Sequence, residues 1–321
     1  TYLAPDYDDR TRLLTLRELM ALLGMFCVIA IPAIVELYDT SLSAKVSAIG
    51  IFVLITIPII TLNGLYQVPD TKSAKVVAKI ENPLKTFKSL FGNTMLNKIV
   101  LAAGLIGFCM SLNGALYLIW MDVVMELPEY SSRLMLMYYL VSVVGLGLWR
   151  YLSIKTSKHF AAGVACFYAI IILLIGFVGF FIIRDLDTEI KLIAVGSFII
   201  LYGFSFSGPM PLINAIIADI SDKLSVDNNE NISGTVFSYL TTITKVGFGL
   251  AAVIPYLVLE LIWGFDIKLG VENTESSKMA IFYIYTFVPI VCYTIASYML
   301  FSHSLGRDEH EKIKSAIEEG S

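Results

Sequence analysis

Long apolar stretches recur along the sequence, and they constrain the fold more than any other feature. A helix rises about 1.5 Å per residue, so about twenty mostly apolar residues cross the roughly 30 Å of hydrocarbon in a bilayer. Eight stretches reach this length, at 18–37, 46–67, 99–123, 134–152, 161–183, 192–216, 234–259 and 279–301. With 57% hydrophobic residues, 16% charged residues and a mean hydropathy of +0.76, the chain is too apolar for a single soluble core. We expect an all-α integral membrane protein with eight transmembrane helices.

One polar segment, 68–98, separates the first two apolar stretches from the other six. It carries six lysines: Lys72, Lys75, Lys79, Lys85, Lys88 and Lys98. We therefore predict four parts. Residues 1–67 hold a cytoplasmic loop and two helices at the end of an N-terminal bundle, and 68–98 are a cytoplasmic linker. Residues 99–302 form a six-helix C-terminal bundle, and 303–321 are a cytoplasmic tail.

Lysine and arginine are unevenly shared between the two sets of loops. The N-terminal stretch, the linker, two alternate loops and the tail hold 16 of them, and the opposite loops hold six. Because basic loops stay in the cytoplasm, this ratio puts both termini on the cytoplasmic side. The net charge of -4 is small and spread over short loops, so nothing indicates a nucleic-acid partner.

A single formal charge, Lys245, lies in the middle of the apolar sequence SYLTTITKVGFGLAAVIPYLVL. It is about eleven residues into its span, hence about 17 Å deep and close to the bilayer midplane. Such a lysine costs about 2.5–3.5 kcal/mol on insertion scales and is tolerated mainly in a polar cavity or beside a counter-charge. The alternative is a lysine satisfied by carbonyl groups and water inside a packed bundle.

No carboxylate of this chain is predicted at the depth of Lys245. Glu36, Asp122 and Glu260 fall near the outer ends of their spans, and Asp219 near an inner end. The sequence also starts without methionine. We therefore expect the partner of Lys245 to lie on helices outside this chain, which would be the C-terminal part of a larger transporter.

Small and hydroxyl-bearing residues surround the lysine. Thr241, four residues earlier, can share its helix face, whereas Gly247 and Ala251, four apart, permit close contact between helices. Ordinary helix packing explains the glycine equally well. For Thr241, packing and a cavity position both remain open.

Two other spans contain residues that can line a transport site. Asn113 and Trp120 lie in the outer half of the third span, where Trp120 can either stack on a sugar or belong to the interfacial aromatic belt. The sixth span contains YGFSFSGPMPLIN, in which Pro209 and Pro211 remove backbone donors. Such a sequence produces either a simple kink or a broken helix beside a site.

The sequence offers little support for metal binding or enzyme chemistry. Its four cysteines are isolated within apolar runs, without C-x-x-C spacing, which argues against a disulfide framework or a zinc site. Its three histidines lie outside any H-E-x-x-H pattern, and G-x-S-x-G is absent. We expect no cofactor and no enzyme activity.

Three motifs together resemble one family. They are PDYDDRTRLLTLRE near the start, GPMPLINAIIADISD before the last cytoplasmic loop, and FSYLTTITKVGFG around the lysine. Their order and spacing resemble the melibiose-carrier-type glycoside, pentoside and hexuronide symporters of the major facilitator superfamily. The resemblance implies that the eight spans are helices five to twelve of a twelve-helix carrier whose first four helices hold the main cation-binding carboxylates.

The resemblance also implies roles for individual residues. Lys245 would lie beside the cation and sugar sites, with Thr241 facing the same cavity, and Arg17 would lie near the sugar. Asp219 and Asp222 would form a cytoplasmic gate with arginines such as Arg10 and Arg12. Two carboxylates at the C-terminal end of a helix oppose its dipole and need cations nearby. The alternative is a pair of solvated loop carboxylates.

The function implied is secondary active transport, in which a coupling cation, Na⁺ or H⁺, drives uptake of a sugar-like solute across the inner or plasma membrane. A carrier of lysolipid or another amphiphile is the alternative, since relatives of the same superfold share the lysine. A wide apolar cavity open to the membrane favours the amphiphile, and a narrow polar cavity with aromatic walls favours the sugar. The sequence KLSVDNNENISG after ADISD departs from the pattern of many relatives, which weakens inference about the gate and the solute.

Overall fold

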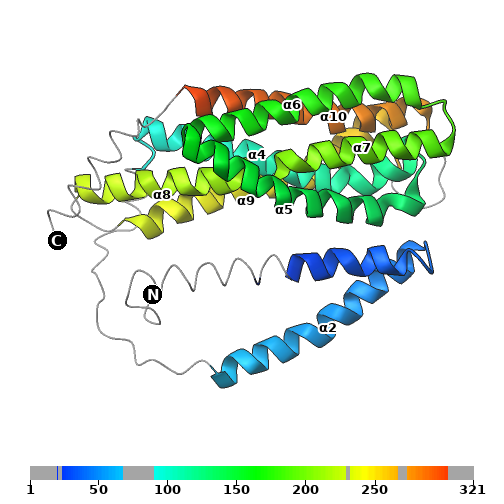
Figure 1. The fold of residues 1–321 in the computed structure, drawn as a ribbon, viewed down its shortest axis with the longest axis horizontal. Helices are drawn as coiled ribbons and strands as arrows, with labels where there is room; N and C mark the ends of the chain where they lie inside the picture. The colour runs from blue at the N-terminus through cyan, green and yellow to red at the C-terminus, as the bar shows by residue number, and fades with distance from the viewer. Residues whose placement is uncertain (1–19, 21–23, 68–89, 229–231, 267–272, 303–321) are drawn as a thin grey trace. The chain divides into compact units, whose positions relative to one another are not determined.

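The computed structural model describes residues 20, 24–67, 90–228, 232–266 and 273–302, and the regular elements in these ranges are all helices (Figure 1). An apolar helix, Gly24–Val35, comes first. The elements that follow are α2 (Leu42–Gln67), α4 (Thr94–Ile119), the π-helical turn η1 (Trp120–Val124), the 3₁₀ turn η2 (Pro128–Tyr130), α5 (Ser131–Lys155), α6 (Lys158–Ile183), α7 (Thr188–Phe206), α8 (Pro209–Asn228), α9 (Ser233–Trp263) and α10 (Glu275–Phe301).

Seven helical segments of the described chain are long and apolar enough to cross a membrane, and they confirm seven of the eight predicted spans. Their bounds are Leu42–Gln67, Thr94–Val124, Pro128–Lys155, Lys158–Ile183, Thr188–Ser225, Ser233–Trp263 and Glu275–Phe301. The remaining span, predicted at 18–37, contains the shorter helix Gly24–Val35. Of its earlier residues only Met20 is described.

Polar caps place several helix starts ahead of the predicted apolar spans. The side chain of Asn93 accepts a hydrogen bond from the Leu96 N–H, and α4 therefore begins at Thr94, inside the segment predicted as a linker. Ser157 caps α6 and Thr274 caps α10 in the same way. These oxygens satisfy N–H groups that have no acceptor within the helix.

The chain groups into two compact units, Thr1–Glu81 with Pro128–Tyr139, and Asn82–Leu127 with Leu140–Ser321. Helix α5 therefore begins in the first unit and ends in the second. In the first unit, Lys45 is the buried residue of α2. The large apolar side chains of this helix are exposed, Leu54 by 74% and Leu65 by 76%. A surface of this kind needs an apolar surrounding, which a bilayer provides.

In the second unit the long helices run alongside one another, with α4 packed against α9 and α10, and α6 against α7, α8 and α10 (Figure 1). The crossing of α4 and α9 depends on glycine. A Cβ added to Gly247 would come within 2.5 Å of the Gly104 carbonyl oxygen. Gly247 therefore serves close helix contact, and Ala251, four residues later, is also buried.

The predicted sixth span is broken into α7 and α8 at Ser207 and Gly208. Pro209 is the first residue of α8, a position where its missing N–H leaves nothing unsatisfied. The Trp149 indole N–H, from α5, donates to the Phe204 carbonyl oxygen at 2.6 Å near the end of α7. A Cβ on Gly208 would meet Ala165 at 2.6 Å, so the break also depends on close packing against α6.

Candidate functional site: the polar face of α9

Helix α9 buries one face and exposes the rest. Its buried residues are Val236, Tyr239, Leu240, Thr244, Gly247, Ala251, Pro255 and Leu259, and this face packs mainly against α4. Lys245 and Thr241 are both exposed on the surface of the second unit. They are four residues apart, so they share one side of the helix.

The exposed surface of α9 has two chemically different sides. Val246, Leu250, Val253 and Leu257 form an aliphatic strip, each about half exposed. Ser238, Thr241 and Lys245 lie along another strip, three and four residues apart. A helix in a membrane faces hydrocarbon with its aliphatic side. The strip with Lys245 is therefore the side suited to a polar surrounding.

Thr241 differs from the two threonines near it. The hydroxyls of Thr242 and Thr244 donate to carbonyl oxygens one turn earlier in their own helix, Ser238 and Leu240, both at 2.8 Å. The Thr241 hydroxyl makes no such bond within the described residues. It is therefore available to a ligand next to Lys245.

Lys245 has a ring neighbour but no counter-charge in the part of the chain that the structure describes. Its Nζ lies 5.4 Å from the centroid of the Phe248 ring. The ion pairs found there join other residues, among them Lys45 with Glu36 and Lys158 with Asp219. An exposed ammonium beside a ring and a free hydroxyl can bind a carboxylate, or a cluster of oxygen ligands around a cation.

Asn113 and Trp120 lie elsewhere, in the interior of the second unit. Asn113 is 8% exposed and its Nδ2 donates to the Tyr202 hydroxyl at 2.5 Å, while Trp120 is 3% exposed and stacks on Tyr285 with 4.9 Å between centroids. Two of their polar atoms, Asn113 Oδ1 and Trp120 Nε1, have no hydrogen-bond partner there. Asn113 belongs to α4, and Trp120, seven residues later, begins η1 directly after it.

An apolar pocket of about 220 Å³ adjoins this interior cluster. It is lined by Trp120, Phe198 and Tyr285 together with residues of α6, α7 and α10. No residue of α9 belongs to its lining, so this pocket and the polar strip around Lys245 are separate features of the second unit.

The two carboxylates predicted at the cytoplasmic gate both belong to α8. Asp219 Oδ2 accepts from Lys158 Nζ at 2.5 Å, and Asp222 is exposed. The helix continues to Asn228, well beyond the predicted end of the span at 216, so both residues precede its last turn. The dipole argument for nearby cations is therefore weaker than expected, because the effect is confined to the last turn.

The structure thus unites some of the predicted residues and separates others. Lys245 and Thr241 share one strip on α9, whereas the contacts of Asn113 and Trp120 involve α4, α7 and α10. Arg10, Arg12 and Arg17 lie outside the described residues. Tyr202, Tyr285 and Lys158 were not predicted, although a tyrosine inside an apolar span is a usable signal, since its hydroxyl needs a partner when buried.

No group of three or more His, Cys, Asp or Glu side chains that could hold a metal occurs in the described ranges. Long apolar helices, a midspan lysine on a polar strip and a helix broken at paired prolines define an integral membrane protein with the features of a solute carrier. A profile of the MFS/sugar transport protein family matches residues 1–307. The chain therefore belongs to this family of the major facilitator superfamily, which points to a transporter. Nothing among curated proteins matches it.

Proposed function

We propose that this protein is a cation-coupled symporter of a sugar-like solute, of the melibiose-carrier type. It would work by alternating access in the inner or plasma membrane, with both termini in the cytoplasm. The observation that carries the proposal is Lys245, a charge at midspan on a polar strip of α9, in a chain of the MFS/sugar transport family.

A carrier has a physical use for this lysine. An unpaired ammonium at midspan is unfavourable, so a carboxylate that binds the coupling cation also stabilises the lysine beside it. Cation, carboxylate and lysine then form one electrostatic cluster whose balance changes when the cation leaves. The free Thr241 hydroxyl, one turn away, supplies an oxygen to the cation or to the solute.

Asn113 and Trp120 are proposed to contact the solute apart from the polar strip of α9, and Arg17 is a further proposed solute contact. The unpartnered Asn113 Oδ1 accepts and Trp120 Nε1 donates, so water or a sugar hydroxyl can satisfy both. Arg17 enters through the family resemblance.

Asp219 and Asp222 enter in the same way as carboxylates of a cytoplasmic gate, with Arg10 and Arg12 as partners. The contact of Asp219 with Lys158 supports a role in charge pairing at this end of α8.

A lysolipid or amphiphile carrier is the second candidate, favoured by the apolar pocket beside Trp120. Its volume of about 220 Å³ can receive part of an alkyl chain. The pocket does not include Lys245, so this candidate leaves the midspan charge without a role. For that reason we favour the sugar-like solute.

Transport into vesicles tests the proposal. Counterflow of a panel of labelled glycosides and lysolipids is measured with and without Na⁺, then repeated with Lys245→Ala. We expect Na⁺- or H⁺-driven accumulation of a glycoside to fall at least about tenfold in the variant, the change produced by about 1.4 kcal/mol of lost coupling.

Lys155→Ala is the matched control, because Lys155 also lies over a ring, that of Tyr151, at 5.8 Å, but at the end of α5. It should transport normally. Normal coupled accumulation by Lys245→Ala contradicts the role given to the lysine, and uptake of lysolipid alone favours the second candidate.

A further inference from the structure

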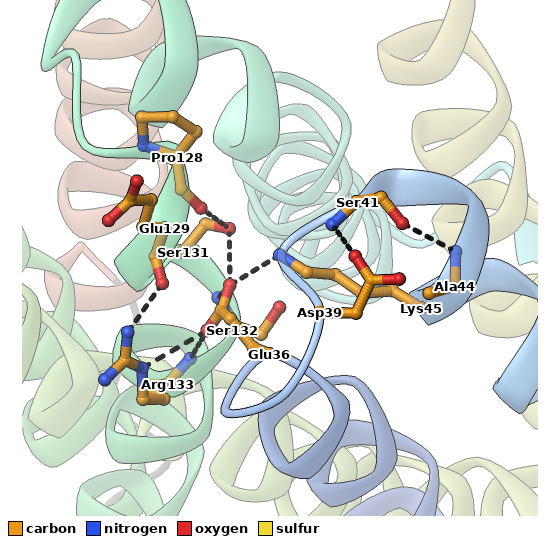
Figure 2. A network of polar contacts seen from close by, with 10 residues as sticks. All are labelled: Glu36, Asp39, Ser41, Ala44, Lys45, Pro128, Glu129, Ser131, Ser132 and Arg133. Carbon is orange, nitrogen blue, oxygen red and sulfur yellow. Dashed lines mark hydrogen bonds and ion pairs between the residues drawn. The ribbon is translucent and has the colours of Figure 1, made fainter.

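The carboxylate of Glu36 is fully buried although it lies in a turn between two helices. Figure 2 shows the polar contacts around it. The turn follows the helix Gly24–Val35 and precedes α2. A buried carboxylate is unfavourable unless hydrogen-bond donors and positive charge surround it. Glu36 obtains both, from two separate parts of the chain.

The first set of donors is the beginning of α5. The Ser132 N–H donates to Glu36 Oε1 at 3.2 Å, and the Arg133 N–H donates to Oε2 at 3.0 Å. These N–H groups belong to the first turn of the helix, where no carbonyl of α5 can accept them. Glu36 therefore caps α5 from a distance of nearly a hundred residues, with its negative charge at the positive end of the helix dipole.

The second donor is Lys45 on α2. Its Nζ lies 2.6 Å from Glu36 Oε1, and its side chain is 9% exposed. Lys45 is also the buried residue of α2. Among the described residues of α2, the buried residue is therefore also the charged one.

Arg133 contributes less directly. Its Nε lies 3.5 Å from Glu36 Oε2, while its guanidinium donates to the Glu129 carbonyl oxygen at 2.7 Å and covers the Tyr130 ring at 4.7 Å. The Ser131 hydroxyl is closer to the Pro128 carbonyl oxygen, at 2.9 Å, than to Glu36, at 3.4 Å. The central contacts are therefore Lys45 and the two backbone N–H groups.

Polar contacts of this kind can form and break reversibly. Hydrogen bonds to a carboxylate are strong at short range but are lost when the partners separate by a few ångströms and water replaces them. Large apolar side chains of α2 remain exposed along its length. The contact therefore depends on its polar groups more than on buried apolar surface of α2.

We propose that Glu36 is a releasable latch: its carboxylate holds the start of α5 to the turn 36–45 in one state of the transport cycle and lets go of it in another. That the latch opens and closes during transport rests on the proposed carrier function. The latch itself is defined by Glu36, Lys45 and the first N–H groups of α5.

A cysteine at Ser132 reports the state of the latch. Ser132 is 6% exposed and contributes its backbone, not its side chain, to the contact with Glu36. The reporter is Ser132→Cys in protein whose exposed Cys27 is replaced by serine, reconstituted in vesicles and labelled with a membrane-impermeant maleimide. Glu36→Gln should accelerate labelling about tenfold, because it removes the charge from every hydrogen bond of the latch.

Asp39→Asn is the matched control. Asp39 is a carboxylate in the same turn, but it is exposed and accepts from the Ser41 N–H at 2.8 Å, not from α5. Its labelling rate should equal that of the parent. Equal rates for Glu36→Gln and Asp39→Asn overturn the proposal.

A charge exchange separates capture of the α5 N-terminus from a simple ion pair. In the double variant Glu36→Lys with Lys45→Glu, the pair of opposite charges is kept, but an ammonium now faces the N–H groups of Ser132 and Arg133. We expect fast labelling to persist. Recovery of the slow parental rate contradicts the role given to α5.

If Glu36→Gln does not yield folded protein, Lys45→Met is used in its place. It keeps the carboxylate at α5 and removes one donor, so it should give an intermediate labelling rate. A parental rate in this variant overturns the part given to Lys45. Because labelling requires no solute, failure of the symport proposal and failure of the latch give different results.

Discussion

Glu36 shows how one carboxylate responds to opposing effects in its surroundings. Burial on its own raises the pKa of this carboxyl, but the hydrogen bond from Lys45, the N–H groups of Ser132 and Arg133 and the charge of Lys45 together hold the pKa below its ordinary 4.5. A lowered pKa in the folded protein means that Glu36 contributes stability above the ordinary pKa and loses it as the pH falls through the lowered value.

We therefore predict that Glu36 stabilises the protein equally from about pH 5 to pH 8 and less below about pH 4. The charged groups that face it are Lys45 and Arg133, and Asp39 lies in the same turn. The measurement is the difference in unfolding temperature between the parent and Glu36→Gln across this range. A difference that already shrinks between pH 8 and pH 6 contradicts the prediction.

Trp149 provides a second prediction at the scale of one residue. Its indole N–H satisfies the Phe204 carbonyl oxygen near the break between α7 and α8. Trp149→Phe keeps most of the ring but leaves this oxygen unpaired, which should destabilise the second unit by about 1–3 kcal/mol. Thermal unfolding in detergent measures the change. Trp263→Phe, at the exposed end of α9, is the control and should have little effect.

At the scale of helices, apolar length predicted where the chain crosses the membrane but not where each helix ends. Hydropathy records which residues suit hydrocarbon, whereas a helix ends where its last backbone groups find other partners. Asn93 starts α4 before its apolar stretch, and α8 continues through polar residues to Asn228. At Pro209 the sequence predicted either a kink or a break, because proline removes a backbone donor, and the structure shows a break.

The crossing of α4 and α9 gives a prediction at this scale. Gly247→Ala places a methyl group where only 2.5 Å separates it from the Gly104 carbonyl oxygen, so the helices must move apart, at a cost of about 1–3 kcal/mol. Gly249→Ala, two residues away, meets nothing within 4 Å and should be neutral or slightly stabilising. Unfolding temperatures of the two variants test this pair, and equal losses contradict the assigned packing.

At the scale of the whole molecule, the sequence predicted that Lys245 needs a partner. It did not predict which residues lie on the same surface as Lys245. Lys245 was evident because one ammonium interrupts an apolar span. Trp120 was ambiguous, since an aromatic residue in the outer half of a span suits a solute site, an interface or a packed interior. The structure places it against Tyr285, a contact between helices far apart in the sequence that no local pattern contains.

Coupling between cation and solute is the property that only the whole protein has, and it gives the last prediction. If Lys245 links the two ligands, the cation raises solute affinity by some factor, and the solute must raise cation affinity by the same factor. In the parent and in Lys155→Ala, the two factors should equal each other and be greater than one. In Lys245→Ala, both factors should approach one. The measurement is equilibrium binding of each ligand at zero and saturating concentrations of the other. If Lys245→Ala retains the parental factor while accumulation is lost, the lysine acts in the movement between states and not in coupling.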